Sequence, residues 1–258
     1  MWNRFVVSIL WVALSFSFGR NLAQVNQQFG GVDASTTSSA SDLSGNWVLK
    51  LPAGAGSYSR YAFIKDEPPM TAWAEEKYKA AKPVLGPHKT SPQESNDPVY
   101  GCFPPGLPRI YLQNKPMEIL QTPEEVIIAY AYDRLVRHIY TDGRGHDDFI
   151  DPPLWMGDSV GNWKGDALVV DVIGFNDKTW LDRVGHRHSE DLHVIERFRR
   201  VDHDTLQDDI TVEDSKAFTK PWNTHVTFVL RPAWEILEYS CADNSNFDEN
   251  LKMQGQGK

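Results

Sequence analysis

The sequence predicts a mainly β protein, an antiparallel lipocalin-like β-barrel of about ten strands with one short helix near the N-terminus. Three observations indicate this class. Short segments with strand-like apolar patterns follow one another from Pro116 onward, the breaks between many of them are short enough for hairpins, and only one segment has a convincing helical pattern. A β-sandwich is the alternative, because barrel closure is not visible in a sequence.

The helix is expected over Pro69–Ala81, where good helix formers carry their acidic residues before their basic ones. The first strand is expected at Gly45–Lys50, and Lys82–Pro108 is rich in proline, glycine and serine, which indicates an irregular crossing. The other strands are expected at Met117–Gln121, Val126–Tyr132, Leu135–Tyr140, Ser159–Trp163, Ala167–Ile173, Leu192–Arg200, Leu206–Glu213, His225–Leu230 and Glu235–Tyr239. In up-and-down order, a closed barrel of these strands has no edges and can hold a ligand in its mouth.

The N-terminus has the pattern of a secretory signal over residues 1–23: Arg4 precedes an apolar run, Phe5–Phe18, and Ala23 is a small residue at a plausible cleavage point. We expect a flexible leader at residues 24–43, a single β-barrel domain at 44–241 and a polar tail at 242–258. The pattern predicts a periplasmic or secreted protein with no membrane span after cleavage. A retained anchor is the alternative.

The chain is acidic, with a net charge of −9, and has no segment rich in lysine and arginine. Such a chain is a poor binder of nucleic acid or anionic membranes, so small neutral or cationic molecules are the expected partners. Nothing in the sequence predicts a nucleotide, haem or flavin cofactor, since the corresponding motifs are absent. The oligomeric state is not predicted.

Two cysteines, Cys102 and Cys241, are present. An even number in an exported chain favours a disulfide between them. Two separate buried thiols are the alternative.

Six of the eight histidines lie between positions 138 and 203, beside several carboxylates. Alternation places Glu196 in an apolar row with Val194 and Phe198, and an ionised carboxylate on a buried face is either paired or part of a site. Asp171 shares a face with Val169, and His138 shares one with Tyr140. We therefore predict that catalysis involves Glu196, His138, Asp171 and His193. The alternatives are an ion pair of Glu196 with Arg137 or Arg197, a hydrogen-bonded Asp171 and a satisfied core histidine at 138.

A His-x-His pair followed by a third histidine is the best-defined candidate for a metal site. His186, His188 and His193 could supply three nitrogens to a divalent transition metal such as Zn²⁺, leaving one position open for water. Zinc would make that water nucleophilic near neutral pH. Solvated loop histidines are the alternative. Trp180, beside this loop, Tyr140 and Arg197 are the predicted substrate contacts, although most tryptophans in such a chain fill the core.

Several segments together resemble a large family of exported bacterial proteins of uncharacterised function. The resemblance covers about Pro98–Cys241 and is carried by Ile139–Arg144, Gly161–Asp166, Gly174–Asp182, His188–Phe198 and Thr219–Trp222. It implies an exported, β-rich protein and carries over no activity. Members usually have glutamate at the position of Lys164 and proline at that of Arg187, which argues against a catalytic role for position 164. Gly45-Asn46-Trp47 is also similar to the Gly-x-Trp motif of lipocalins.

These observations favour an exported β-barrel enzyme that acts on a small neutral molecule, a sugar derivative or a phenolic, as a metal-assisted or acid–base lyase or hydrolase. A lipocalin-like binding or carrier protein without catalysis is the first alternative. A structural subunit of an envelope complex is the second, and a large exposed apolar patch on the outer barrel face would favour it.

Overall fold

The computed structural model describes residues 41–51, 61–147, 149–237 and 239–241, all within one compact unit of the chain. The predicted signal (1–23), most of the predicted leader (24–43) and the predicted polar tail (242–258) lie outside the described residues. Within the described ranges, no helix has the length and apolar composition that a membrane crossing requires.

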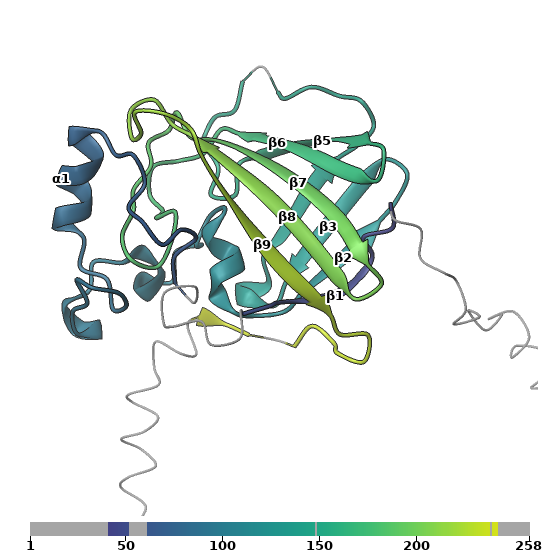
Figure 1. Ribbon diagram of the computed structural model, residues 1–258, viewed down its shortest axis with the longest axis horizontal. Helices are drawn as coiled ribbons and strands as arrows, with labels where there is room; N and C mark the ends of the chain where they lie inside the picture. The colour runs from purple at the N-terminus through teal and green to yellow at the C-terminus, as the bar shows by residue number, and fades with distance from the viewer. Residues whose placement is uncertain (1–40, 52–60, 148, 238, 242–258) are drawn as a thin grey trace, which may run out of the picture. The chain divides into compact units, whose positions relative to one another are not determined.

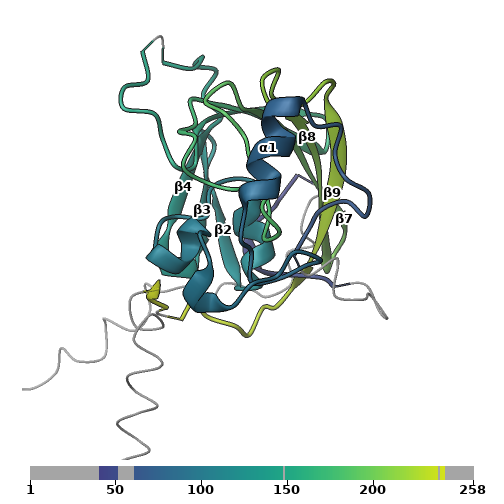
Figure 2. The same ribbon diagram turned by 90° about the vertical axis from the view of Figure 1, so that its left-hand side faces the viewer.

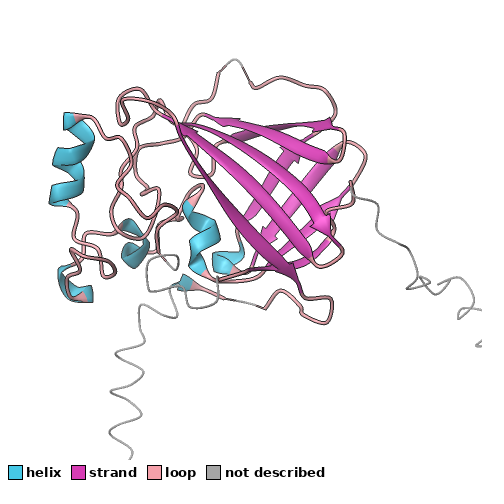
Figure 3. Cartoon of the chain, viewed as in Figure 1, coloured by secondary structure: helices cyan, strands magenta, loops and turns pink. Residues whose placement is uncertain are grey.

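A closed β-barrel forms the body of the protein (Figures 1 and 3). It confirms the predicted fold class, and most strands lie within a few residues of their predicted bounds. In the described part of the chain the strands are β1 (Gly45–Leu49), β2 (Met117–Gln121), β3 (Glu125–Tyr130), β4 (Val136–Tyr140), β5 (Asp158–Lys164), β6 (Ala167–Ile173), β7 (His193–Asp202), β8 (Thr205–Glu213) and β9 (Trp222–Leu230).

Strand pairing follows chain order, and β1 pairs with β9 to close the barrel. One junction departs from the antiparallel prediction: β4 and β5 pair in parallel, with Tyr140 opposite Val160. The long connection 141–157 makes this possible, because parallel neighbours need a crossover that a hairpin cannot supply. The predicted tenth strand, Glu235–Tyr239, does not form in its described residues. Since β9 already pairs with β1, the closed sheet leaves that segment no free edge.

Side-chain alternation fills the inside of the barrel. Along β7, Val194, Glu196 and Phe198 are buried while their neighbours are half-buried, and β8 alternates in the same way. The interior row predicted from the sequence of β7 is therefore confirmed. The core includes Trp47, Met117, Ile119, Ile128, Ile139, Leu168, Val170, Phe198, Leu206, Ile210 and Phe228.

Helix α1 (Ala72–Ala80) is the predicted helix, shorter at both ends than expected. It begins after Thr71, whose side chain accepts a hydrogen bond from the backbone N–H of Ala74, and it ends at Ala81, which is extended. Figures 1 and 2 show α1 at one end of the barrel. Four short 3₁₀ helices also occur in the described residues: η3 (Pro92–Glu94), η4 (Pro98–Gly101), η5 (Arg109–Gln113) and η6 (Tyr132–Arg134).

Residues 61–114 and 174–192 pack against each other, and together we call them the cap. The rings of Tyr78 and His186 stack at 4.4 Å between centroids. Gly185 lies so close to helix α1 that a Cβ atom there would come within 2.5 Å of the Ala81 side chain. From η5, Tyr111 reaches the barrel interior and contacts Glu196, so the cap is anchored inside the barrel.

Two further contacts hold the ends of the described chain. Leu43, at the end of the predicted leader, is buried, and its carbonyl accepts a hydrogen bond from the Trp47 indole at 2.9 Å. Cys102 and Cys241 form the predicted disulfide, with Cα atoms 5.5 Å apart and a sequence separation of 139. It ties η4, in the cap, to the segment that follows β9.

Candidate functional site

Glu196, the predicted general base, lies inside the barrel in a paired cluster. Its carboxylate accepts hydrogen bonds from Arg137 at 2.5 Å and from the Tyr111 hydroxyl at 2.5 Å. Arg137 also donates to Ser159 at 3.0 Å. The side chains of Glu196 and Arg137 are 0 % and 1 % exposed. Because substrate has no access to this carboxylate, the arrangement is the ion pair weighed as the alternative, and Glu196 is not placed to act as a general base.

Asp208 adds a second buried acid to the interior. One of its oxygens accepts a hydrogen bond from the backbone N–H of Arg197 at 3.1 Å, and the other has no partner among the described residues. Burial, reinforced by the nearby negative charge of Glu196, raises the pKa of Asp208 well above its ordinary value. This direction fits the position, since Arg137 offers one positive charge for two buried acids.

The structure separates three of the residues that were predicted to take part in catalysis. His138 lies on the outside of β4, where its side chain is 50 % exposed and contacts Glu125 at 2.5 Å. Tyr140, on the same outer face, packs beneath the Arg144 guanidinium at 3.9 Å. Asp171 also faces outward and is exposed. Glu196, His138 and Asp171 therefore do not form one site: Glu196 faces the barrel interior, whereas His138 and Asp171 face solvent.

A string of alternating histidines and carboxylates runs across the outside of β5–β8. We call it the outer array; it comprises His146, Asp158, Asp171, His193 and Glu213. His193 Nε2 lies 2.6 Å from Asp171 Oδ1, and His193 Nδ1 lies 3.2 Å from Glu213 Oε2. His146 Nδ1 lies 2.7 Å from Asp158 Oδ2, while its Nε2 faces Asp171 Oδ1 at 3.6 Å. Asp171 is thus bracketed by two imidazoles.

Strand register explains how the outer array assembles. Asp171 pairs across the sheet with Ile195, and His193 pairs with Glu213, so neighbouring strands bring the outward side chains together. His146 comes from the connection 141–157. Asp171 and His193 were predicted and do meet. The sequence analysis missed the other three: alternation along β8 could have placed Glu213 beside His193, but the loop residue His146 carries no such signal.

His186 is held by carboxylates on both sides. Its Nδ1 lies 2.5 Å from Asp182 and its Nε2 lies 2.6 Å from Glu67. Burial alone would lower the pKa of His186, but the negative charges of Asp182 and Glu67 outweigh burial and raise it to about 9. The ring therefore donates through both nitrogens at neutral pH, and no lone pair is left for a metal.

This geometry predicts a pH-dependent contribution to stability. The pKa of His186 is about 9 when folded, above the ordinary 6.5, so the folded state binds the proton more tightly. The stabilisation is complete below pH 6.5 and is lost as the pH rises towards 9. From pH 6 to pH 9.5 the free energy of unfolding of the wild type should fall as this stabilisation is lost. We expect the fall in His186→Asn to be smaller than that in the wild type by about 2–3 kcal/mol. Urea unfolding at both pH values measures this, and parallel losses in the two proteins would contradict it.

The ring nitrogens of His188 are engaged in a different way. His188 is fully buried; its Nδ1 donates to the Ser189 carbonyl at 2.9 Å, and its Nε2 accepts from the Thr179 hydroxyl at 2.6 Å. Burial lowers the pKa of His188, in keeping with this neutral tautomer. With His193 held by Asp171 and Glu213, the three predicted ligands each have separate partners. Within the described ranges, no group of three or more His, Cys, Asp or Glu side chains is arranged to hold a metal.

The other predicted substrate contacts are divided between the cap and the barrel wall. Trp180 is 0 % exposed and lies between the guanidiniums of Arg109 and Arg187, at 5.4 and 5.3 Å from its ring centroid. It therefore packs inside the cap rather than presenting a face to a ligand. Arg197 lies on the outer side of β7, the face that also carries His193.

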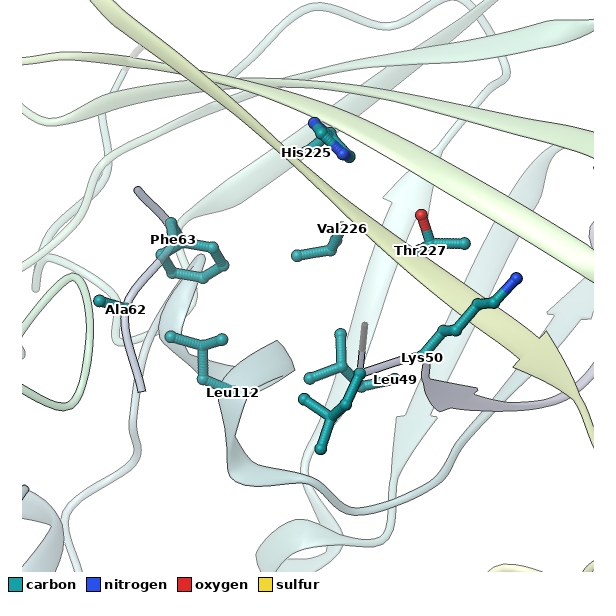
Figure 4. A pocket seen from close by; sticks show the side chains of 9 residues that line it. Leu49, Lys50, Ala62, Phe63, Leu112, His225, Val226 and Thr227 are labelled. Atoms are coloured by element: carbon teal, nitrogen blue, oxygen red, sulfur yellow. The ribbon is translucent and has the colours of Figure 1, made fainter. Parts of the chain in front are cut away.

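Three cavities lie near the cap, the β1–β9 junction and the segment after β9. One of about 100 Å³ opens where β1 and β9 meet; in Figure 4, Phe63, Leu112 and Val226 surround its apolar space. A larger one of about 500 Å³, lined mainly by apolar side chains including Trp234 and Leu237, lies beside the segment after β9. A third, of about 160 Å³, lies in the cap. None of these three is lined by a residue of the outer array.

Comparison of the chain with protein-family models, curated proteins and solved structures gives no match. The arguments for function therefore depend on the geometry of the sites alone.

Proposed function

We propose that the protein is an exported enzyme that uses the outer array for acid–base chemistry on a small neutral molecule, such as a sugar derivative or a phenolic. One observation carries this proposal. The Asp171 side chain is 53 % exposed, and its Oδ1 lies 2.6 Å from His193 Nε2 and 3.6 Å from His146 Nε2. The disulfide is compatible with an oxidising compartment.

The residues of the outer array have separate roles in a lyase or hydrolase reaction. Asp171 accepts a proton from a substrate carbon or from an attacking water as the general base. Once Asp171 is protonated it releases the His193 Nε2–H, and that N–H donates its proton to the departing oxygen as that bond breaks. The proton taken up by Asp171 then returns to His193 through their hydrogen bond, which restores both groups. Glu213 and Asp158 orient the two imidazoles through their Nδ1 atoms.

Asp171→Asn and His193→Gln test the assignment. On whichever member of a panel of nitrophenyl sugars and phenolic esters the wild type turns over, each change is expected to lower kcat about 10²–10⁴-fold. His203→Gln is the matched control, because His203 forms an exposed pair with Asp204 at 2.7 Å outside the array. Wild-type kcat in both array variants would refute the proposal.

Metal assistance, with zinc as the first candidate, is tested on the same proteins purified without chelator. About one equivalent of zinc in the wild type, absent from His193→Gln, would make the reaction metal-assisted. An active, metal-free wild type would leave acid–base catalysis by the side chains alone.

A small-molecule binding protein without catalysis is the second candidate. The feature that favours it is the cavity in the cap, where a half-buried arginine lacks an anionic partner. Such a protein would retain a ligand in stoichiometric amount and release no product, whereas an enzyme would release product.

A further inference from the structure

The cap contains a pocket that is separate from the outer array. It has a volume of about 160 Å³ and is lined by Trp73, Lys77, Asp177, Arg187 and His188. Trp73 and Lys77 come from helix α1, and the other three come from the 174–192 part of the cap. A single water needs about 10–15 Å³, so the pocket has room for a small organic molecule rather than for one ion alone.

Arg187 is the unusual member of this pocket. Its Nε is shielded from solvent and has no hydrogen-bond partner among the described residues. Its guanidinium contacts the Trp180 ring at 5.3 Å, and no described carboxylate lies within ion-pair distance of it. Burial lowers the pKa of Arg187, and the more distant charges of Asp97 and Asp177 offset this only in part.

The surroundings of Arg187 do not neutralise it. Arg109, on the same Trp180 ring, is already matched by Asp97, with which it forms two hydrogen bonds of 2.8 and 2.6 Å. Lys77 adds a second positive charge to the pocket, and Asp177 is its one carboxylate. His188 contributes no charge, because both ring nitrogens are engaged and burial keeps it neutral. The pocket is therefore locally cationic in a chain of net charge −9.

From this geometry we propose that the pocket binds a small monocarboxylate that also carries hydroxyl groups, a sugar acid in chemical class. The carboxylate pairs with the planar guanidinium of Arg187, which suits two parallel hydrogen bonds, and Lys77 adds charge at the rim. Asp177 accepts from a ligand hydroxyl and disfavours multiply charged anions. Trp73 packs against the carbon chain. This proposal does not rest on the outer array.

Calorimetric titration with sodium gluconate at pH 7 and constant ionic strength tests the proposal. Sorbitol, which has no carboxylate, and sulfate, which has no hydroxyl-bearing carbon chain, are the comparison ligands. We expect gluconate to bind with one-to-one stoichiometry and sorbitol and sulfate to bind at least tenfold more weakly. No gluconate binding at millimolar concentration, or equal affinity for gluconate and either comparison ligand, would overturn it.

Two substitutions locate the site. Arg187→Gln is expected to weaken gluconate binding at least tenfold. Arg187→Lys is expected to weaken it less, because lysine keeps the positive charge but cannot form two parallel hydrogen bonds with a carboxylate. Arg199→Gln, on the outer face of β7, is the matched control and is expected to bind as the wild type does. Unchanged affinity in Arg187→Gln would refute the site. Thermal unfolding checks that Arg187→Gln is folded: removing an unpaired, half-buried charge should leave its Tm unchanged or higher.

A final experiment distinguishes a failure of this binding proposal from a failure of the proposed enzyme activity. Asp171→Asn is expected to bind gluconate with wild-type affinity, because Asp171 does not line the pocket. Loss of binding in that variant would contradict two separate sites. Loss of turnover with binding retained supports both proposals.

Discussion

Arg137→Met is expected to lower the free energy of unfolding by about 3–5 kcal/mol at pH 7. Methionine is unbranched and apolar and cannot donate, so the Glu196 carboxyl would lose the guanidinium with which it pairs among the described residues. The Glu196 side chain is 0 % exposed, and Tyr111 would be left as its one side-chain partner. A buried charge that loses its partner costs far more than the pair contributes, because the desolvation of the remaining ion is no longer offset.

Urea unfolding at pH 7 measures this effect. Two further variants test whether the loss comes from the unpaired buried charge. Arg144→Met removes an exposed ion pair with Asp142 and is expected to cost far less than Arg137→Met, because solvent screens that pair. Arg137→Met combined with Glu196→Leu removes both charges and should recover most of the lost stability. A loss below about 1 kcal/mol for Arg137→Met alone would show that Glu196 is readily neutralised in the folded protein.

The buried pair also determines where a ligand can bind. Lipocalin-like barrels hold a ligand in the mouth or interior, but here Tyr111, from the cap, inserts from one end and meets Arg137 and Glu196. Phe198 and Trp47 are among the side chains that fill the remaining space. Binding and chemistry are therefore expected on the outer barrel wall or within the cap, where the outer array and the Arg187 pocket lie.

The sequence predicted the barrel because the pattern that defines it is local. Alternation along His193–Asp202 placed Glu196 on the buried face and His193 on the other, and both placements are confirmed. The same reasoning could not orient Asp171, since Ala167–Ile173 is apolar on both faces. Nor could it exclude a tenth strand, because whether β1 meets β9 depends on contacts between the two ends of the barrel.

The described structure does not bring the three predicted metal ligands together, for a physical reason of the same kind. The spacing of His186 and His188 suits a metal, but spacing does not reveal what else reaches each ring. Glu67, more than one hundred residues earlier, contacts His186, and Thr179 contacts His188. The partners of each ring determine whether an imidazole has a free lone pair, and the spacing of the histidines does not reveal those partners.

Replacing both cysteines with alanine is expected to lower the free energy of unfolding by about 4–5 kcal/mol, because the Cys102–Cys241 bridge restricts the unfolded chain over a sequence separation of 139. The bridge holds the segment after β9 against η4, and the Cys241 backbone N–H also donates to Asp133, in η6, at 3.2 Å. Urea unfolding of the double variant beside the oxidised wild type measures the loss.

The reduced wild type separates the two contributions to this loss. It keeps both sulfur atoms but not the crosslink, so a stability equal to that of the double variant would assign the effect to the crosslink. A reduced wild type that is clearly more stable than the variant would assign the difference to packing around Cys241, which is buried. If the double variant is as stable as the oxidised wild type, the bridge does not stabilise the fold. In that case the protein could fold fully in a reducing compartment, and the disulfide would no longer support an exported enzyme.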